Sequence, residues 1–196
     1  MTEPVIQALT PERLDDFLAY FDGDAFAEGN TRWAGCTCYF YHTPADSAEA
    51  WVEACKNGSN RAGAAELIRR GQMHGYLAYA DGRVVGWCHA APRHTLPNLG
   101  RALGTQLDPG ETVGSIVCFN IAAPYRRTGL AGRLLAAACA GFAHLGLSVA
   151  EAYPQKAPVS VLSYHGPLVL YEAAGFSRAG ELEHCWVYRK VLTGPG

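Results

Sequence analysis

The stretch Val117-Cys-Phe-Asn-Ile-Ala-Ala-Pro-Tyr-Arg-Arg-Thr-Gly-Leu-Ala-Gly-Arg-Leu-Leu135 decides the fold of this chain. An apolar strand pattern runs to Ile121 and breaks at Pro124, and a basic, glycine-containing turn then leads directly into a helix. The first amides of a helix lack acceptors within the helix, and the helix dipole favours negative charge beside them. The turn is therefore a candidate site for the pyrophosphate group of a ligand that contains a diphosphate.

The composition is that of one soluble globular domain, or of a domain with a long N-terminal extension. The chain has 196 residues, 49% of them hydrophobic and 17% charged, which is enough to build a sizeable core. A net charge of -2 argues against nucleic acid as the main partner. No apolar run approaches the roughly 20 residues of a membrane helix, and residues 1–6 lack the pattern of a signal peptide. We therefore expect a cytoplasmic protein without membrane contact, and we interpret its seven scattered cysteines as reduced thiols.

Hydrophobic spacing predicts a helical beginning and a mixed remainder. In the N-terminal part we expect helices at residues 11–21, 47–56 and 60–70, the first with Thr10 as cap, and a short strand within the aromatic-rich residues 33–42. Asp81-Gly82 predicts a tight hairpin between strands 76–80 and 83–89. Beyond it we expect a long loop at 92–110, strands at 113–121, 148–153 and 181–192, and helices at 129–145 and 167–174. This order predicts one mixed α/β domain.

Two motifs together point to a family. The turn Arg126-Arg127-Thr128-Gly129-Leu130-Ala131 fits the pattern Arg/Gln-x-x-Gly-x-Gly/Ala in a strand-turn-helix setting, and Tyr164-x-Gly166-Pro167-x-x-x-Tyr171-x-x-x-Gly175-Phe176 follows it. In this combination the chain resembles the GNAT superfamily of acyl-CoA-dependent N-acetyltransferases, over roughly residues 75–190. The resemblance implies a GNAT-like, mostly antiparallel central sheet flanked by helices. It divides the single domain of residues 1–196 into a helical N-terminal part (1–72) and an acyl-CoA-binding core (75–192).

The resemblance also implies acetyl-CoA as cosubstrate and a set of residues that bind it. Amides of the turn would hold the pyrophosphate, and an amide of the preceding strand would act as a single-donor oxyanion hole for the acetyl carbonyl. The two arginines could instead be solvated side chains of a surface loop, and Asn120 could be a strand-end residue without a ligand. The implied cofactor-binding residues are Phe119, Asn120, Ile121, Arg126, Arg127, Thr128, Gly129, Leu130, Ala131, Gly132 and Tyr171.

The catalytic residues that the resemblance implies are Tyr171 and Glu151. Tyr171 would donate a proton to the leaving thiolate, although a tyrosine at this spacing could also be a core aromatic. A general base is needed because an amine with a pKa of about 10 must lose a proton before it attacks. Glu151 lies where some family members keep a carboxylate, and Glu111 and His165 are its competitors. Ser115 stands where another branch of the family has its base, so the mechanism of that branch is not expected here.

A second group of residues has metal-ligand chemistry. Zinc accepts cysteine and histidine, but the usual two-residue spacing between paired cysteines is absent. Adjacent Cys88 and His89 should also point to opposite faces of a strand. We expect no metal, and we expect an aromatic, partly buried wall of the acceptor pocket to explain these stretches. The potential ligands are Cys36, Cys38, His42, Cys88, His89 and His94, and the surrounding aromatics are Trp33, Tyr39, Phe40, Tyr41 and Trp87.

These observations predict transfer of an acetyl group from acetyl-CoA to a primary amine by direct attack in a ternary complex. The acceptor is expected to be a small molecule such as an aminoglycoside, a polyamine or an amino-acid derivative. Its pocket would be built from the N-terminal helices, the 92–110 loop and the turn after Phe176. Alternatives are a non-catalytic sensor or interaction domain that binds CoA or acyl-CoA, a zinc-stabilised interaction domain, and a protein or peptide N-acetyltransferase. The N-terminal helices either close the pocket or form the interface of a homodimer.

Overall fold

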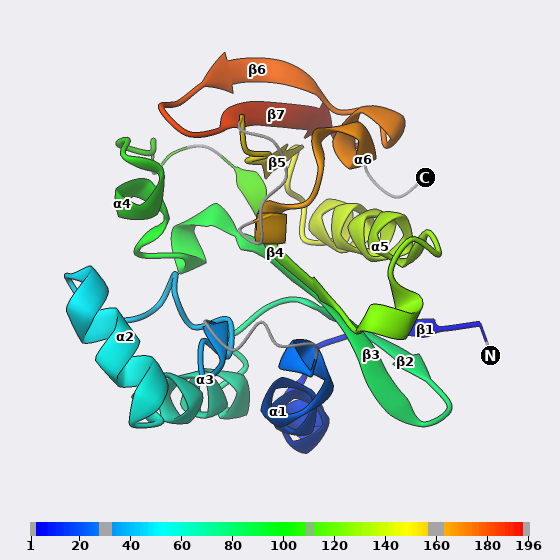
Figure 1. Cartoon of the computed structure of the whole chain (residues 1–196). Coiled ribbons are helices and arrows are strands. Elements are labelled where there is room, and N and C mark those ends of the chain that lie inside the picture. Colours follow the sequence, from blue (N-terminus) through cyan, green and yellow to red (C-terminus); the bar gives the residue numbers. More distant parts are fainter. Residues whose placement is uncertain (1–2, 28–32, 109, 111, 157–162, 194–196) are drawn as a thin grey trace.

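A seven-stranded sheet in the order β1-β2-β3-β4-β5-β7-β6 forms the centre of the protein (Figure 1). The computed structural model describes residues 3–27, 33–108, 110, 112–156 and 163–193. Neighbouring strands are antiparallel except for the parallel pair β4–β5. The strands are β1 Val5–Ala8, β2 Tyr76–Ala80, β3 Arg83–Pro92, β4 Val113–Ile121, β5 Val149–Ala152, β6 Ser177–Glu181 and β7 Trp186–Val191.

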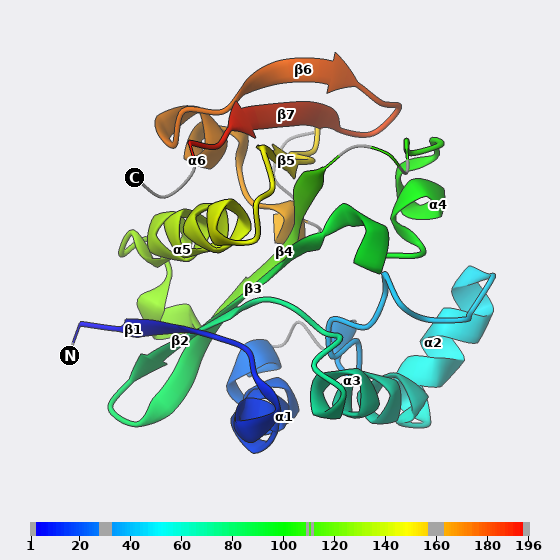
Figure 2. The same cartoon turned by 180° about the vertical axis from the view of Figure 1, so that it is seen from behind.

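Helices cover both faces of the sheet. The α-helices are α1 Leu14–Asp22, α2 Ala48–Lys56, α3 Ser59–Arg69, α4 Leu99–Leu103, α5 Leu130–His144 and α6 Leu168–Ala173. Short 3-10 turns are η1 Pro11–Arg13, η2 Asp24–Phe26, η4 Arg93–Thr95, η5 Ala123–Tyr125 and η6 Ser163–His165. Both views place α5 on one side of β2–β4 and helices α1 to α3 on the other (Figures 1 and 2). The mixed α/β fold with a mostly antiparallel sheet is confirmed.

Two buried clusters fix these layers. On the α5 side, Leu134, Leu135 and Ala138 are fully buried against the sheet. Helix α5 approaches closely because Gly114 of β4 carries no side chain: a Cβ there would lie 2.4 Å from the ring of Phe142. On the other side, the helices α1 and α3 bury their apolar faces against Trp87 of β3. Helices α1 and α5 thus pack on the sheet through their apolar faces.

The predicted hairpin is confirmed by its backbone geometry. Asp81 and Gly82 join β2 to β3 with φ values of 49° and 75°. Two successive residues at positive φ are typical of the type I′ turn, whose twist matches that of the strands that it joins. The turn therefore fixes the β2–β3 register on which the rest of the sheet is built.

Strands β4 and β5 separate partway along their length. Their pairing runs from Val113 opposite Val149 to Ile116 opposite Ala152, whereas β4 continues to Ile121 beside β3. The β3–β4 register shifts between His89 and Ala90, which leaves Val117 without a residue opposite it. A bulge of this kind bends a strand and strengthens its twist. Among the described residues, the last part of β4 has no strand on its β5 side, and this opening positions the site.

The structure corrects several predicted elements. The strand expected within residues 33–42 is wrong, since the segment consists of turns and Gly35, Thr37 and Cys38 have φ values of 80°, 46° and 51°. Strand geometry requires negative φ. The single long strand expected at 181–192 is wrong as well, because the chain turns back between β6 and β7. The first helix begins as η1, and the Thr10 side chain does not cap it: its hydroxyl oxygen accepts a hydrogen bond from Nη1 of Arg13 at 2.8 Å.

Other differences are additions. Strand β1 was not predicted within the N-terminal part; it is short and joins the sheet edge beside β2. The 92–110 segment contains η4 and the short helix α4. No helix in the described part of the chain combines the length and apolar character needed to cross a membrane.

Candidate functional site

A cavity of about 620 Å³ lies beside the separated end of β4. One end is lined by Arg126 and Ala131 of the turn before α5 and the helix start. The middle is lined by residues 118–121 of β4 and by Gly166 and Pro167. The other end is lined by aromatic and small residues of the N-terminal part, namely Phe21, Ala25, Phe26, Trp33, Cys36, Cys38, Phe40, Tyr41 and Trp51, together with Tyr164. One cavity thus joins the predicted donor site to the N-terminal segment.

The turn before α5 has the backbone geometry of an anion site. Arg127 and Gly129 have φ values of 61° and 84°, and α5 begins directly after Gly129. A Cβ on Gly129 would meet nothing within 4 Å, so the backbone there faces open space. The Arg126 Nε donates to the carbonyl of Ile121 at 2.9 Å, and the Thr128 hydroxyl donates to the carbonyl of Tyr125 at 2.8 Å. The turn is fixed by these bonds, and the first amides of a helix have no acceptor within it, which fits the diphosphate of coenzyme A.

The end of β4 lines the cavity as predicted, but the side chain of Asn120 has another role. Its Oδ1 accepts a hydrogen bond from the Tyr20 hydroxyl at 2.6 Å, and its Nδ2 donates to the carbonyl of Ala25 at 3.2 Å. These bonds tie β4 to α1 and η2. The backbone of Phe119, Asn120 and Ile121 stays the predicted site for the thioester, whereas the Asn120 side chain joins the two ends of the cavity.

Tyr171 lies in the core beneath the cavity. It is fully buried in α6, packs against Phe176 with ring centroids 5.5 Å apart, and donates its hydroxyl proton to the carbonyl of His165. Burial raises the pKa of Tyr171 well above its ordinary value, so the phenol keeps its proton. Tyr171 is not among the residues that line the cavity, although Gly166, next to its acceptor, is. Its role as proton donor stays a prediction.

Glu151 is the centre of a buried ion network. Its Oε2 lies 2.5 Å from the Nε of Arg189, and its Oε1 lies 3.4 Å from Nη1 of Arg93. The Tyr153 hydroxyl donates to Oε1 at 2.5 Å and lies 2.9 Å from the hydroxyl of Ser115. Glu151 therefore shares a strand face with Tyr153, as alternation predicted. Both of its oxygens are engaged and the residue does not line the cavity, so its role as general base stays a prediction without geometric support.

Of the two competing bases, His165 is described by the structure and does not line the cavity. His165 is buried, and burial lowers its pKa to about 4, with a hydrogen bond to the Val117 backbone acting in the opposite direction. Ser115 is fully buried beside Tyr153. Glu111 lies outside the described residues. Among the described residues that line the cavity there is no Asp, Glu or His.

The cysteines and histidines pack rather than converge. The Cys38 Sγ lies 3.4 Å from Nδ1 of His89, and the ring of His42 stacks on His89 with centroids 5.5 Å apart. Cys88 belongs to the cluster under α5, so it points away from His89 as alternation predicted. Within the described ranges, no three His, Cys, Asp or Glu side chains form a group that could hold a metal ion. The zinc alternative therefore gains no geometric support.

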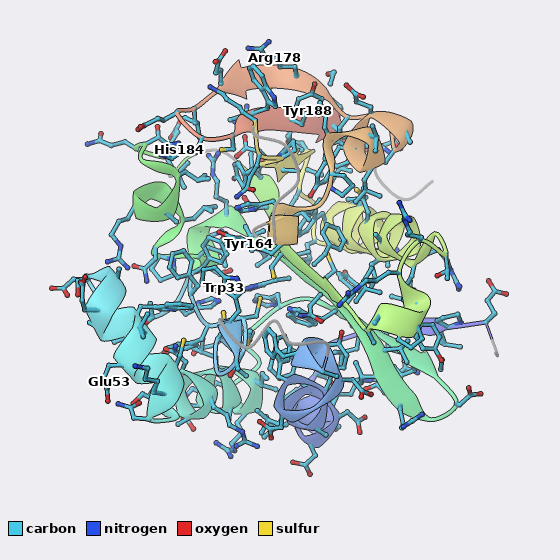
Figure 3. All side chains as sticks on the ribbon, in the orientation of Figure 1. Trp33, Glu53, Tyr164, Arg178, His184 and Tyr188 are labelled. Carbon is cyan, nitrogen blue, oxygen red and sulfur yellow. The ribbon has the colours of Figure 1, made fainter. Side chains whose placement is uncertain are left out.

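The aromatic wall was predicted in part. Trp33, Phe40 and Tyr41 line the cavity. Trp87 is instead buried under α1, and Tyr39 lines a separate pocket. Sequence reasoning did not place Phe21, Phe26, Trp51 and Tyr164 in this wall. Trp33 and Tyr164 lie together near the middle of the molecule (Figure 3), with ring centroids 6.4 Å apart. The sequence signal that could have pointed to Tyr164 was its position in the downstream motif. The 92–110 loop and the turn after Phe176, which were expected to help build the acceptor pocket, contribute no described residue to the cavity.

Comparison with known proteins identifies the family of this fold. Residues 41–158, more than half of the chain, match the family model described as Acetyltransferase (GNAT) family. No curated protein sequence gives a significant match. The PaiA N-acetyltransferase of Thermoplasma acidophilum, solved in complex with coenzyme A, is similar with a TM-score of 0.59 at 13% identity, over 97% of this chain and 99% of that one.

Two further solved structures have the same fold. YncA of Salmonella typhimurium, a putative acetyltransferase solved with acetyl-CoA, has a TM-score of 0.58 at 12% identity, over 100% of this chain and 97% of that one. A ribosomal-protein-alanine N-acetyltransferase of Brucella melitensis has a TM-score of 0.56 at 17% identity, over 96% and 99%. At these identities the likeness establishes the fold and no acceptor.

Proposed function

Since the chain belongs to the GNAT family of acetyltransferases, which act with acetyl-CoA, we propose that it acetylates the primary amine of a small molecule by direct attack in a ternary complex. The observation that carries this proposal is the single cavity that runs from Arg126 and Ala131 to the aromatic N-terminal segment. Its volume of about 620 Å³ lies within the range of small-molecule sites. Donor and acceptor can therefore occupy one space at the same time.

The donor end supplies binding and orientation. Amides at the start of α5 bind the diphosphate, with Arg126 and Arg127 adding positive charge. Gly129 and Ala131 keep the approach to the backbone open, and Thr128 fixes the turn through its bond to Tyr125. The backbone of β4 between Phe119 and Ile121 holds the thioester beside the strand opening and offers an amide to the carbonyl oxygen as it gains negative charge.

The chemical step needs two proton movements. The amine nitrogen attacks the acetyl carbon, the carbon–sulfur bond breaks, the leaving thiolate takes up a proton, and the amine gives one up. Tyr171 is the proposed donor to sulfur, because its motif position supports it and its buried phenol stays protonated. Tyr164 is the second candidate, because it lines the cavity and burial raises its pKa to about 12.

One observation favours the non-catalytic alternative, a domain that binds CoA or an acyl-CoA without turnover. The Tyr171 hydroxyl and both Glu151 oxygens are engaged within the protein. The two functions are separated by incubating the protein with acetyl-CoA and a library of primary amines and detecting N-acetyl products and free CoA by liquid chromatography with mass spectrometry. This readout avoids thiol reagents, which would react with the protein's own cysteines. Tight CoA binding without any product would refute the enzymatic proposal.

A further inference from the structure

The acceptor end of the cavity is an almost continuous aromatic surface. Trp33 and Trp51 have ring centroids 5.4 Å apart, and Phe40 meets Trp51 edge-on at 5.6 Å. Tyr164 extends this wall beyond Trp33. On the α1 side, Phe21 and Phe26 form a second aromatic pair at 6.1 Å. A ligand ring placed between these walls would gain apolar burial and edge or face contacts with several rings.

Among the lining residues that the structure describes, the same end has no compensating negative charge. Arg126, at the donor end, is the one Asp, Glu, Lys, Arg or His among the described lining residues. Burial raises the pKa values of the Cys36 and Cys38 thiols and of the Tyr41 and Tyr164 phenols, so these groups are neutral at physiological pH. An ammonium group that entered without a carboxylate partner would lose its hydration uncompensated. A polyamine or an aminoglycoside carries several such groups.

Desolvation has the opposite consequence for a single reacting amine. Removal from water disfavours the charged ammonium and so favours the neutral amine, which is the nucleophile. Before it loses its proton, the ammonium can be held over an aromatic face. A cavity without a lining carboxylate can therefore still deliver a reactive amine, provided that this amine is the only cation of the molecule.

We propose that the acceptor is an aromatic monoamine, whose ring occupies the walls formed by Trp33, Trp51 and Phe26 and whose amine points toward the end of β4. This inference rests on the proposed function and narrows it to one substrate class. It replaces the aminoglycosides and polyamines that the sequence alone had suggested. The recognised chemistry is an apolar ring joined by a short linker to one primary amine.

The test compares amines that differ in one property. Steady-state kcat/KM is measured with acetyl-CoA for 2-phenylethylamine, tryptamine, hexylamine, 1,6-diaminohexane and spermidine. We expect both aromatic monoamines to exceed the diamine and spermidine by at least about 100-fold, because the extra ammonium is unpaired. They should exceed hexylamine by about 2- to 10-fold through ring contacts. Equal or higher values for spermidine or 1,6-diaminohexane would overturn the inference, and equality with hexylamine would overturn its aromatic part.

A charge-insertion variant tests the reason for this preference. Phe26→Glu places a carboxylate in the half-buried aromatic wall, and it should raise the ratio of kcat/KM for 1,6-diaminohexane over hexylamine by about 10-fold. The matched control, Val52→Glu, adds the same charge on α2 at a side chain that is 43% exposed and does not line the cavity. The control should leave the ratio unchanged, and an equal change in both variants would refute the role of the wall.

The two proposals fail in different ways. CoA binding is measured by calorimetry for the wild type and both variants, which also shows that each is folded. Absence of product from every amine with CoA binding intact would refute the enzymatic function. Turnover that favours polycations would leave the enzyme in place and refute only the substrate class.

Discussion

Replacing Tyr171 by phenylalanine separates the catalytic role of this residue from its structural one. The variant removes one hydroxyl from a fully buried side chain and leaves the His165 carbonyl without its donor. An unsatisfied buried acceptor costs about 1–3 kcal/mol. For a domain of this size that corresponds to a fall in Tm of about 2–12 °C. This loss is expected whether or not Tyr171 donates a proton.

The catalytic role predicts a second, independent loss. General acid catalysis contributes about 10²- to 10⁴-fold, so kcat of Tyr171→Phe should fall at least about 100-fold at a temperature where the variant is folded. The Kd for CoA should stay within about threefold, because the turn before α5 is untouched. Because burial holds the pKa of Tyr171 far above its ordinary value, the donor stays protonated and kcat should not fall from its deprotonation between pH 7 and about pH 10.

Tyr164→Phe is the matched control, since it removes a hydroxyl from a half-buried tyrosine that lines the cavity. Rates are measured by chromatographic detection of the acetylated amine and stability by thermal unfolding. If Tyr171→Phe lowers Tm but keeps kcat within threefold of wild type, its role as donor is refuted. A large loss of kcat in Tyr164→Phe alone would transfer the role to Tyr164.

Three further predictions follow from buried polar contacts. Glu151→Gln removes the negative charge that the Arg93 and Arg189 guanidinium groups contact, and it should lower stability by about 1–3 kcal/mol while CoA affinity is retained; denaturant unfolding checks this, and an unchanged midpoint would contradict a structural ion network. Tyr20→Phe removes the donor to Asn120 and should raise KM for the acceptor more than Kd for CoA; an effect on CoA alone would contradict the assignment of the N-terminal segment to the acceptor. The pKa of His165 is lowered to about 4 in the folded protein, below an unfolded value of about 6.5, so the stability from its neutral form is present above pH 6.5 and is lost as pH falls toward 4. The urea midpoint of the wild type should fall as pH is lowered across this window, and the fall should be smaller in His165→Asn. An equal fall of the midpoint in both proteins would refute the role of His165.

The turn before α5 could be predicted because it depends on local backbone geometry. A strand followed by a glycine-containing turn and a helix can be recognised without knowledge of distant contacts, so the turn at Gly129 was identifiable from sequence, and its binding of the donor stays a proposal. Strands β2 to β5 and the hairpin at Asp81-Gly82 could be predicted from hydrophobic periodicity and turn chemistry for the same reason.

The acceptor half depends on contacts between distant segments. Phe26, Trp51 and Tyr164 line one cavity only because η2, α2 and η6 converge on the end of β4, and no local spacing contains that information. Residues 33–42 misled the strand prediction because aromatic enrichment is shared by strands and by packed turns, and only the positive φ values separate them. The sequence could not show that Glu151 is engaged by two arginines, because Arg93 and Arg189 come from elsewhere in the chain.

The side chain of Asn120 has a consequence for how the two substrates affect each other's binding. It sits on the strand that is proposed to carry the thioester, and its two hydrogen bonds reach Tyr20 and Ala25 beside the acceptor wall. These bonds link β4 to the segment of Tyr20 and Ala25, so a ligand that orders one of the two segments also favours order in the other. By thermodynamic linkage, whatever acetyl-CoA does to the affinity for the amine, the amine does equally to the affinity for acetyl-CoA. Removing these two hydrogen bonds should therefore weaken the effect of each substrate on the affinity for the other before it abolishes the binding of either substrate.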